Sequence, residues 1–241
     1  MVFQIQAGEC LVKPEWRKVL ITVFTVIFTS GCSGTVVSKG ERALELGDFQ
    51  LAITLFSKVL EHNPADAEAR LGIGKAFLQK AAAQGGDTTA WRQALMHLEA
   101  ARTLHGSLEV NRLVAQVWTE RGTELLDASD TLAALGAFSR AIAIDGNSPE
   151  PLNLAGIVYY RTGRADNARR LFERALAADS TNTATLFNLG MLYWEEHAVK
   201  AAHTLWLRAL KGAPGDEELL YWFSAAEKKL RESAIAGDTG Q

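Results

Sequence analysis

A 34-residue stretch near the C-terminal end of the chain decides the fold. From Thr183 to Asp216 it reads TATLFNLGMLYWEEHAVKAAHTLWLRALKGAPGD. Large apolar residues three, four and seven positions apart lie on one stripe of an α-helix, and this spacing occurs in both halves of the stretch. Gly190 and Ala202 are small where two paired helices must come close, and Pro214 cannot continue a helix. The stretch therefore predicts a helix–turn–helix unit.

The same residue types return at a fixed period of 34 residues. The recurring columns are Gly122, Gly156 and Gly190; Ala134, Ala168 and Ala202; Phe138, Phe172 and Trp206; and Ala141, Ala175 and Ala209. A period of this length indicates one supersecondary unit that is stacked on its neighbours, because a single unit has no core large enough to stand alone. Two weaker units precede these columns, one around Gly40 and Phe56 and one around Gly74 and Leu98. We expect an all-α solenoid whose function lies in its surface.

Within one unit, the pattern Leu186-x-x-Leu189-Gly190-x-x-Tyr193 resembles the tetratricopeptide repeat (TPR). The resemblance implies a TPR superhelix in which the first helix of each unit lines a concave face. We expect repeats over residues 32–66, 67–114, 115–148, 149–182 and 183–216, a capping helix over 217–232 and a disordered tail over 233–241. The second repeat is too long for the period. Its extra residues are assigned to an extended loop at Gln84–Thr89 and to a spacer at Glu109–Val114, which would lengthen the next helix.

The N-terminal segment differs from the rest of the chain. Lys13, Arg17 and Lys18 precede the apolar run from Val19 to Phe28, and small residues then lead to Cys32. A basic segment, a short apolar segment and small residues predict a secretory signal peptide, here residues 1–31. The end of this segment resembles the bacterial lipobox, which implies a lipidated Cys32 and a protein held at the outer membrane, facing the periplasm. The alternative is an uncleaved transmembrane anchor, since residues 19–38 carry no charge.

Composition argues against several classes of function. The formal charge of −3 does not favour nucleic acid or an anionic membrane surface as an electrostatic partner. The two cysteines, Cys10 and Cys32, leave no thiol pair in a processed chain for a disulfide framework. No His-Glu-x-x-His, Cys-x-x-Cys or Gly-x-Ser-x-Gly motif occurs. We therefore expect no catalytic residues, no metal site, no cofactor and no small-molecule substrate.

A binding groove is predicted from a second stripe on the first helices of the repeats. One residue beyond the packing stripe turns 100° around a helix, and on the C-terminal repeats this second stripe is rich in aromatic residues. Exposed apolar surface marks interaction sites, and aromatic residues are common anchors. The alternative is that neighbouring helices, or the capping helix, bury the stripe. The predicted partner groove consists of Asn153, Ile157, Tyr160, Phe187, Asn188, Met191, Trp194 and Tyr221.

These features predict a non-catalytic scaffold lipoprotein that binds a protein or peptide. The layout of signal, lipobox and repeats resembles the lipoproteins that assist type IV and Tad (Flp) pilus assembly, which implies a secretin or another assembly component as partner. Alternatives are an adaptor for cell-wall hydrolases, polysaccharide export or outer-membrane assembly complexes, a structural oligomer, and an enzyme or enzyme subunit.

Overall fold

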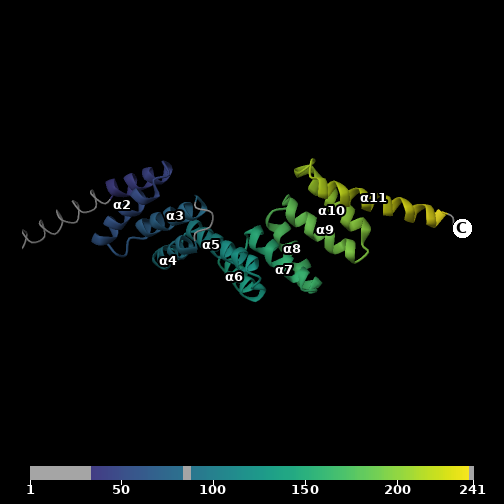
Figure 1. Cartoon of the computed structure of the whole chain (residues 1–241), viewed down its shortest axis with the longest axis horizontal. Coiled ribbons are helices and arrows are strands. Elements are labelled where there is room, and N and C mark those ends of the chain that lie inside the picture. Colours follow the sequence, from purple (N-terminus) through teal and green to yellow (C-terminus); the bar gives the residue numbers. More distant parts are fainter. Residues whose placement is uncertain (1–33, 84–87, 239–241) are drawn as a thin grey trace, which may run out of the picture. The chain divides into compact units, whose positions relative to one another are not determined.

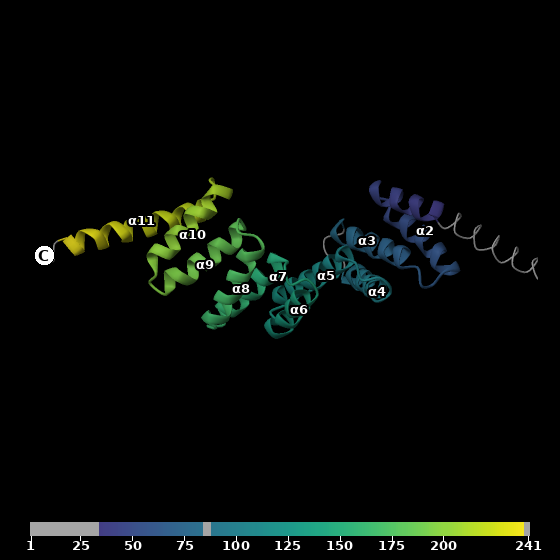
Figure 2. The ribbon, with the colours of Figure 1, turned by 180° about the vertical axis from the view of Figure 1, so that it is seen from behind.

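The chain is described by a computed structural model that covers residues 34–83 and 88–238. Within these ranges the secondary structure is helical and contains no strand. The chain divides into two compact units, the first ending at His105 and the second beginning at Gly106. This boundary falls inside the range 67–114 that was expected to form the second repeat. Figures 1 and 2 show the helical hairpins of each unit from opposite sides.

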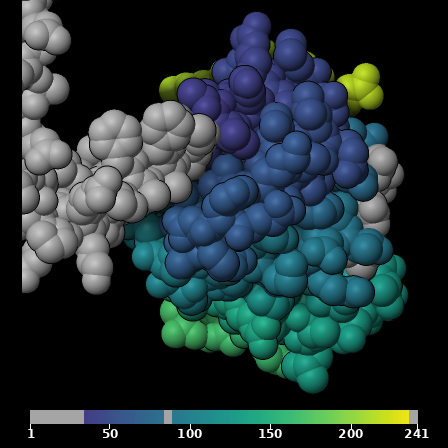
Figure 3. All heavy atoms as spheres, turned by 90° about the vertical axis from the view of Figure 1, so that its left-hand side faces the viewer, coloured from purple at the N-terminus to yellow at the C-terminus, as the bar shows by residue number. Residues whose placement is uncertain are grey.

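The first unit is a small helical stack built around one aromatic side chain. Phe56 is 1% exposed, and a Cβ atom added at Gly40 would lie 2.7 Å from its ring. A Cβ atom at Gly72 would also collide with this ring, so both glycines allow helices to approach Phe56 closely. Figure 3 shows the closely packed side chains of this part of the chain. Its helices are residues 34–45, α2 (Phe49–His62), α3 (Ala67–Ala83) and α4 (Thr88–Leu104).

The second unit continues as a series of antiparallel hairpins. Helices α5 and α6, α7 and α8, and α9 and α10 pack in pairs, and α11 packs on α10. Each pair also contacts the next, which confirms the expected all-α solenoid of helix–turn–helix repeats. The helices are α5 (Leu108–Asp127), α6 (Thr131–Ile144), α7 (Pro149–Arg161), α8 (Ala165–Ala178), α9 (Thr183–Glu195), α10 (Val199–Gly212) and α11 (Glu217–Asp238).

The repeated glycine column faces the repeated aromatic column, as the spacing predicts. A Cβ atom at Gly156 would lie 2.6 Å from the Phe172 ring, and Gly190 faces Trp206 in the same way. Phe172 and Trp206 are fully buried. Because ring and glycine belong to the two helices of one hairpin, this contact sets the distance between them.

Within the described residues, four hairpin turns each hold one residue in the left-handed region. This position is Gly47 and Gly163, both at φ 74°, but also Ser129 at φ 64° and His197 at φ 61°. At Gly163 the backbone N–H donates to the carbonyl of Tyr160, a hydrogen bond that closes the end of the helix. Glycine adopts this conformation without steric cost, whereas serine and histidine do not.

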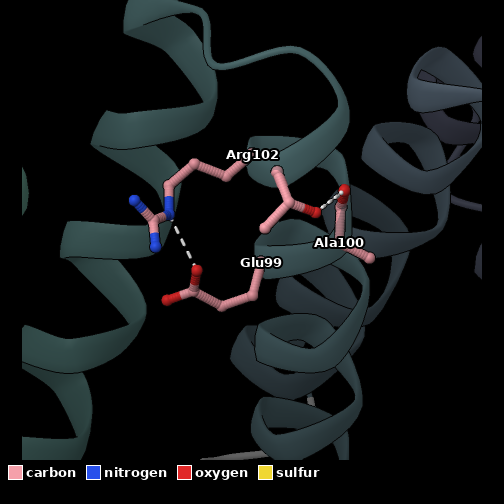
Figure 4. Close-up of polar contacts among 4 residues, drawn as sticks. Glu99, Ala100 and Arg102 are labelled. Atoms are coloured by element: carbon pink, nitrogen blue, oxygen red, sulfur yellow. Dashed lines mark hydrogen bonds and ion pairs between the residues drawn. The ribbon is translucent and has the colours of Figure 1, made fainter.

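The extra residues of the second repeat lengthen its helices. Helices α3 and α4 each contain 17 residues, against 13 for α7 and 14 for α8. Thr88 and Thr89, which were expected in the loop, belong to the first turn of α4. The predicted spacer at Glu109–Val114 lies within α5, which has 20 residues and begins at Leu108. Near the end of α4, Arg102 Nε donates to Glu99 at 2.7 Å on the helix surface (Figure 4).

The C-terminal helix extends beyond its predicted end. We expected the capping helix to end at residue 232 and a disordered tail to follow, but α11 continues to Asp238. The physical reason is that no glycine or proline interrupts the sequence until Gly237, and Ala234 and Ala236 favour helix. No helix within residues 34–83 and 88–238 is both long and apolar enough to cross a bilayer. The predicted signal peptide, residues 1–31, and the predicted lipidation site Cys32 lie outside the described residues.

Candidate partner-binding groove

Two predicted groove residues, Asn153 on α7 and Asn188 on α9, form a direct contact between neighbouring repeats. Asn188 Nδ2 donates to Asn153 Oδ1 at 3.0 Å. Asn153 is only 8% exposed, whereas Asn188 is half-buried. Among the described residues, the Asn153 amide nitrogen and the Asn188 amide oxygen have no other hydrogen bond. This amide pair, Asn153 and Asn188, therefore retains the N–H donors of Asn153 and the carbonyl acceptor of Asn188.

A second polar contact joins the same two helices nearer their C-terminal ends. The Tyr160 hydroxyl on α7 donates a hydrogen bond to the carboxylate of Glu195 on α9. Burial of the phenol raises the pKa of Tyr160 to about 12, and the hydrogen bond and the negative charge of Glu195 add to this shift. Glu195 was not predicted as a site residue. The contact fixes a predicted groove residue against a carboxylate at the edge of the groove.

The aromatic residues predicted on α9 are partly buried because they pack against Trp206. The Phe187 and Trp194 ring centroids lie 6.5 and 5.9 Å from that of Trp206. The Trp206 Nε1 also donates to the backbone carbonyl of Phe187 at 3.2 Å. Phe187 and Trp194 are half-buried. They support the hydrophobic core while leaving part of their surface accessible.

Helix α11 covers another part of Trp194. The ring of Trp222 lies 5.9 Å from that of Trp194, and the Lys229 ammonium lies 4.8 Å from the Trp194 ring centroid. This is a cation–π contact. Helix α11 therefore covers one side of Trp194, in line with the alternative that neighbouring helices bury the stripe. Trp206 and Lys229 were not predicted as neighbours of the groove.

The remaining predicted residues range from half-buried to exposed. Ile157 on α7 and Met191 on α9 are half-buried and pack against the hydrophobic core of the second unit. Tyr221 on α11 is 65% exposed, and its ring meets that of Trp222 edge-on at 5.3 Å. We call Phe187, Met191, Trp194 and Tyr221 the aromatic wall. The aromatic wall and the amide pair together combine apolar surface with side-chain amides, which resemble the amides of a peptide backbone.

The described residues form no group of three or more His, Cys, Asp or Glu side chains that could hold a metal ion. The polar side-chain contacts between repeats in the predicted groove use the amides of Asn153 and Asn188 and the phenol of Tyr160, which donates to Glu195 outside the predicted set. Such an arrangement is suited to binding a polypeptide, because amides match the donors and acceptors of a peptide backbone.

Comparison with known proteins agrees with this architecture. The sequence profile of the tetratricopeptide repeat family matches residues 37–86 and 153–217, so it finds repeats in both units. The matched segments extend from the first described helix to α3 and from α7 to α10. A search of curated protein sequences finds no match to the chain.

Three solved structures illustrate the similarity of the fold. Pseudomonas aeruginosa pilF is 16% identical, with 87% of this chain and 89% of that chain covered and a TM-score of 0.55. MamA is 22% identical, with 74% and 90% covered and a TM-score of 0.50. YrrB, described as a TPR protein with an unusual peptide-binding site, is 18% identical, with 77% and 89% covered and a TM-score of 0.50. These similarities establish the TPR fold, a fold typical of protein–protein interaction scaffolds.

Proposed function

We propose that the chain is a non-catalytic scaffold that binds an extended segment of a partner protein along α7, α9 and α11. The observation that carries this proposal is the amide pair, which retains a donor and an acceptor beside the aromatic wall. The Asn153 amide nitrogen would donate to a carbonyl of the partner, and the Asn188 amide oxygen would accept from an N–H. Main-chain hydrogen bonds supply affinity, and pockets for side chains supply specificity.

The aromatic wall would take an apolar side chain of the same segment. Tyr221 is the most accessible member, and Phe187 and Trp194 are already ordered by their contacts with Trp206. Rings that are held in place before binding lose little conformational entropy when a partner arrives. This preorganised wall therefore supports binding of an aromatic or large aliphatic residue.

Peptide selection tests this function directly. A random 12-residue peptide library would be selected on the full-length chain, purified in mild detergent, and the recovered peptides would be synthesised and titrated by fluorescence anisotropy. We expect Asn188→Ala and Tyr221→Ser to weaken binding about ten-fold each, with little change in melting temperature. The matched control is Leu132→Ser, because Leu132 is 82% exposed and lies on α6. Equal affinity for all three variants would contradict a groove on this face.

We further propose that the scaffold is anchored in the bacterial cell envelope through a lipidated Cys32, facing the periplasm from the outer membrane. Two or more acyl chains hold a protein stably on a membrane, whereas one binds marginally. Labelling with radioactive palmitate would compare wild type with Cys32→Ser in cells. Incorporation that is lost in the variant supports the anchor, and equal incorporation contradicts it.

Within the envelope, we propose assembly of a type IV or Tad pilus as the process served. The support is the order of the predicted signal peptide, the lipobox-like segment and the repeats, together with the predicted groove. Crosslinking in intact cells followed by purification would score secretin subunits against cell-wall hydrolases. Recovery of secretin that falls in Tyr221→Ser but not in Leu132→Ser supports the proposal, and recovery of hydrolases with the same dependence contradicts it.

A further inference from the structure

A polar cleft opens in the second unit, at the start of the third repeat. Its volume is about 580 Å³, and it lies between the first half of α5 and the turn that leads into α7. The side chains that matter most are Arg112, Gln116 and Thr119 from α5, and Asp145, Ser148 and Glu150 from the turn and α7. None of these residues belongs to the predicted groove.

The cleft exists because α5 is longer than the other first helices of this unit. Ala115 is in register with Pro149 and Thr183, where α7 and α9 begin, but α5 begins at Leu108. The extra turns of α5 have no counterpart on α7, so the space beside them is left open. Thr119 occupies the same repeat column as Asn153. The cleft therefore continues the line of the groove into the preceding repeat.

This part of the unit carries all of its excess negative charge. Residues 106–150 contain seven acidic and three basic residues, whereas residues 151–241 contain eleven of each. Among the described residues, neither Asp145 nor Glu150 forms an ion pair. Charge imbalance on one surface favours a partner of the opposite sign.

Glu150 lines the cleft and interacts unfavourably with Glu120, a carboxylate of α5 that lies outside the lining. Burial raises the pKa of Glu120, next to Thr119 on α5, and the negative charges of Glu150 and Glu124 add to this effect. Glu124 is neutralised by Arg121, whose Nη1 lies 2.8 Å from its carboxylate, but Glu120 and Glu150 have no such cation among the described residues. A cation placed between α5 and the start of α7 would remove this repulsion.

We propose that the cleft binds a lysine or arginine side chain of the same partner segment that occupies the aromatic wall. The inference rests on the proposed function and specifies the partner: an extended segment with an apolar residue at one end and a basic residue at the other. Asp145 and Glu150 line the cleft and supply negative charge, and Glu120 adds to it from outside the lining. Gln116 and Ser148 offer neutral hydrogen-bonding groups. Arg112 also lines the cleft and opposes a positive charge placed there.

The test uses the peptides selected on the full-length chain. We expect them to contain a lysine or arginine at a fixed spacing from an aromatic or large aliphatic residue. The double variant Glu120→Gln/Glu150→Gln is expected to weaken binding about ten-fold, since an exposed ion pair contributes up to about five-fold. Arg112→Gln is expected to tighten binding about two-fold. Glu173→Gln on α8, an exposed carboxylate outside the cleft, is the matched control and leaves affinity unchanged.

Several results would overturn the inference. A peptide whose basic residue is replaced by glutamine and still binds equally, or a double variant with wild-type affinity, excludes the basic side chain from the cleft. If Asn188→Ala and Tyr221→Ser weaken binding while the cleft variants do not, the proposed groove stands and the cleft proposal fails. Saturable binding of free spermidine at micromolar concentration, lost in the double variant, would identify a polyamine site instead. A library that yields no binder contradicts both proposals.

Discussion

The third and fifth repeats share one backbone arrangement but present different surfaces. In the fifth repeat the aromatic column holds Trp206, which contacts Phe187 and Trp194 and fills the space behind the groove. In the third repeat the same column holds Phe138, and Thr119 stands where the fifth repeat has Phe187. The fifth repeat is therefore an aromatic wall and the third a polar cleft. The repeat columns that face inward define the fold, and the neighbouring column defines what each repeat can bind.

The largest expected effect compares the aromatic column of the fifth repeat with that of the third repeat. Trp206→Ala and Phe138→Ala each remove a fully buried ring, which costs about 3–5 kcal/mol of unfolding free energy. We expect the tryptophan variant to lie at the upper end, because it also removes the contacts with three neighbouring aromatic rings. Denaturant unfolding monitored by circular dichroism measures both. A smaller loss for Trp206→Ala than for Phe138→Ala would contradict the central position assigned to Trp206.

A glycine pair sharpens the comparison between packed and open positions. Gly156→Ala places a methyl group 2.6 Å from the Phe172 ring and is expected to destabilise the fold by about 1–3 kcal/mol. Gly136→Ala, within α6, meets nothing within 4 Å and is expected to stabilise by about 0.5–1 kcal/mol. The two substitutions are chemically identical, so thermal unfolding of both isolates the packing term. Shifts of the same sign would show that the glycine column is not set by contact with the aromatic ring.

Substitutions in the hairpin turns are expected to change stability by a smaller amount. The sign depends on whether a glycine is introduced or removed at the turn. Ser129→Gly and His197→Gly should each stabilise by up to about 1 kcal/mol, because both residues have positive φ. Gly163→Ser at the equivalent turn should destabilise by a similar amount. Differential scanning calorimetry would show melting temperatures that rise in the first two variants and fall in the third. Unchanged melting temperatures for all three would mean that the turns carry no strain.

The contact between the fourth and fifth repeats has a pH signature that the third repeat lacks. Tyr160 is predicted to ionise at about pH 12, above the ordinary value of 10.0, because burial and Glu195 penalise the phenolate in the folded state. Its contribution to stability is therefore complete below pH 10 and is lost as the pH rises through about 12. Absorbance titration at 295 nm should show that Glu195→Gln moves this ionisation downward. The equivalent residue in the third repeat is Leu126, which cannot titrate.

Most of the fold could be predicted from the sequence because its determinants are local and repeated. The glycine and aromatic columns, 34 residues apart, identify which side chains meet inside each hairpin, and the Gly156–Phe172 contact follows from them. The end of α11 was missed because residues 233–236 contain no residue that stops a helix, so nothing there distinguishes a tail from a continued helix.

The surface of the groove was harder to predict. A helical-wheel argument places Phe187 and Trp194 on one face of α9, but it does not show how far Trp206 reaches from α10 or that Lys229 covers Trp194. The amide contact joins Asn153 and Asn188, which are 35 residues apart in sequence and lie on different helices. The spacer at Glu109–Val114 was found from the excess of the second repeat over the 34-residue period. The cleft beside it could not be predicted in this way, because it also depends on where α7 begins. Contacts between repeats therefore had to come from the structure.

The central claim is that a partner lies along the α7–α9–α11 face. The most direct measurement is photo-crosslinking in living cells, with a photoreactive phenylalanine analogue at Tyr221, which is 65% exposed, or at Leu132, which is 82% exposed. The account predicts a discrete crosslinked partner from position 221, mapped to a segment that contains an apolar and a basic residue, and none from position 132. Equal crosslinking from both positions, or from position 132 alone, would contradict it.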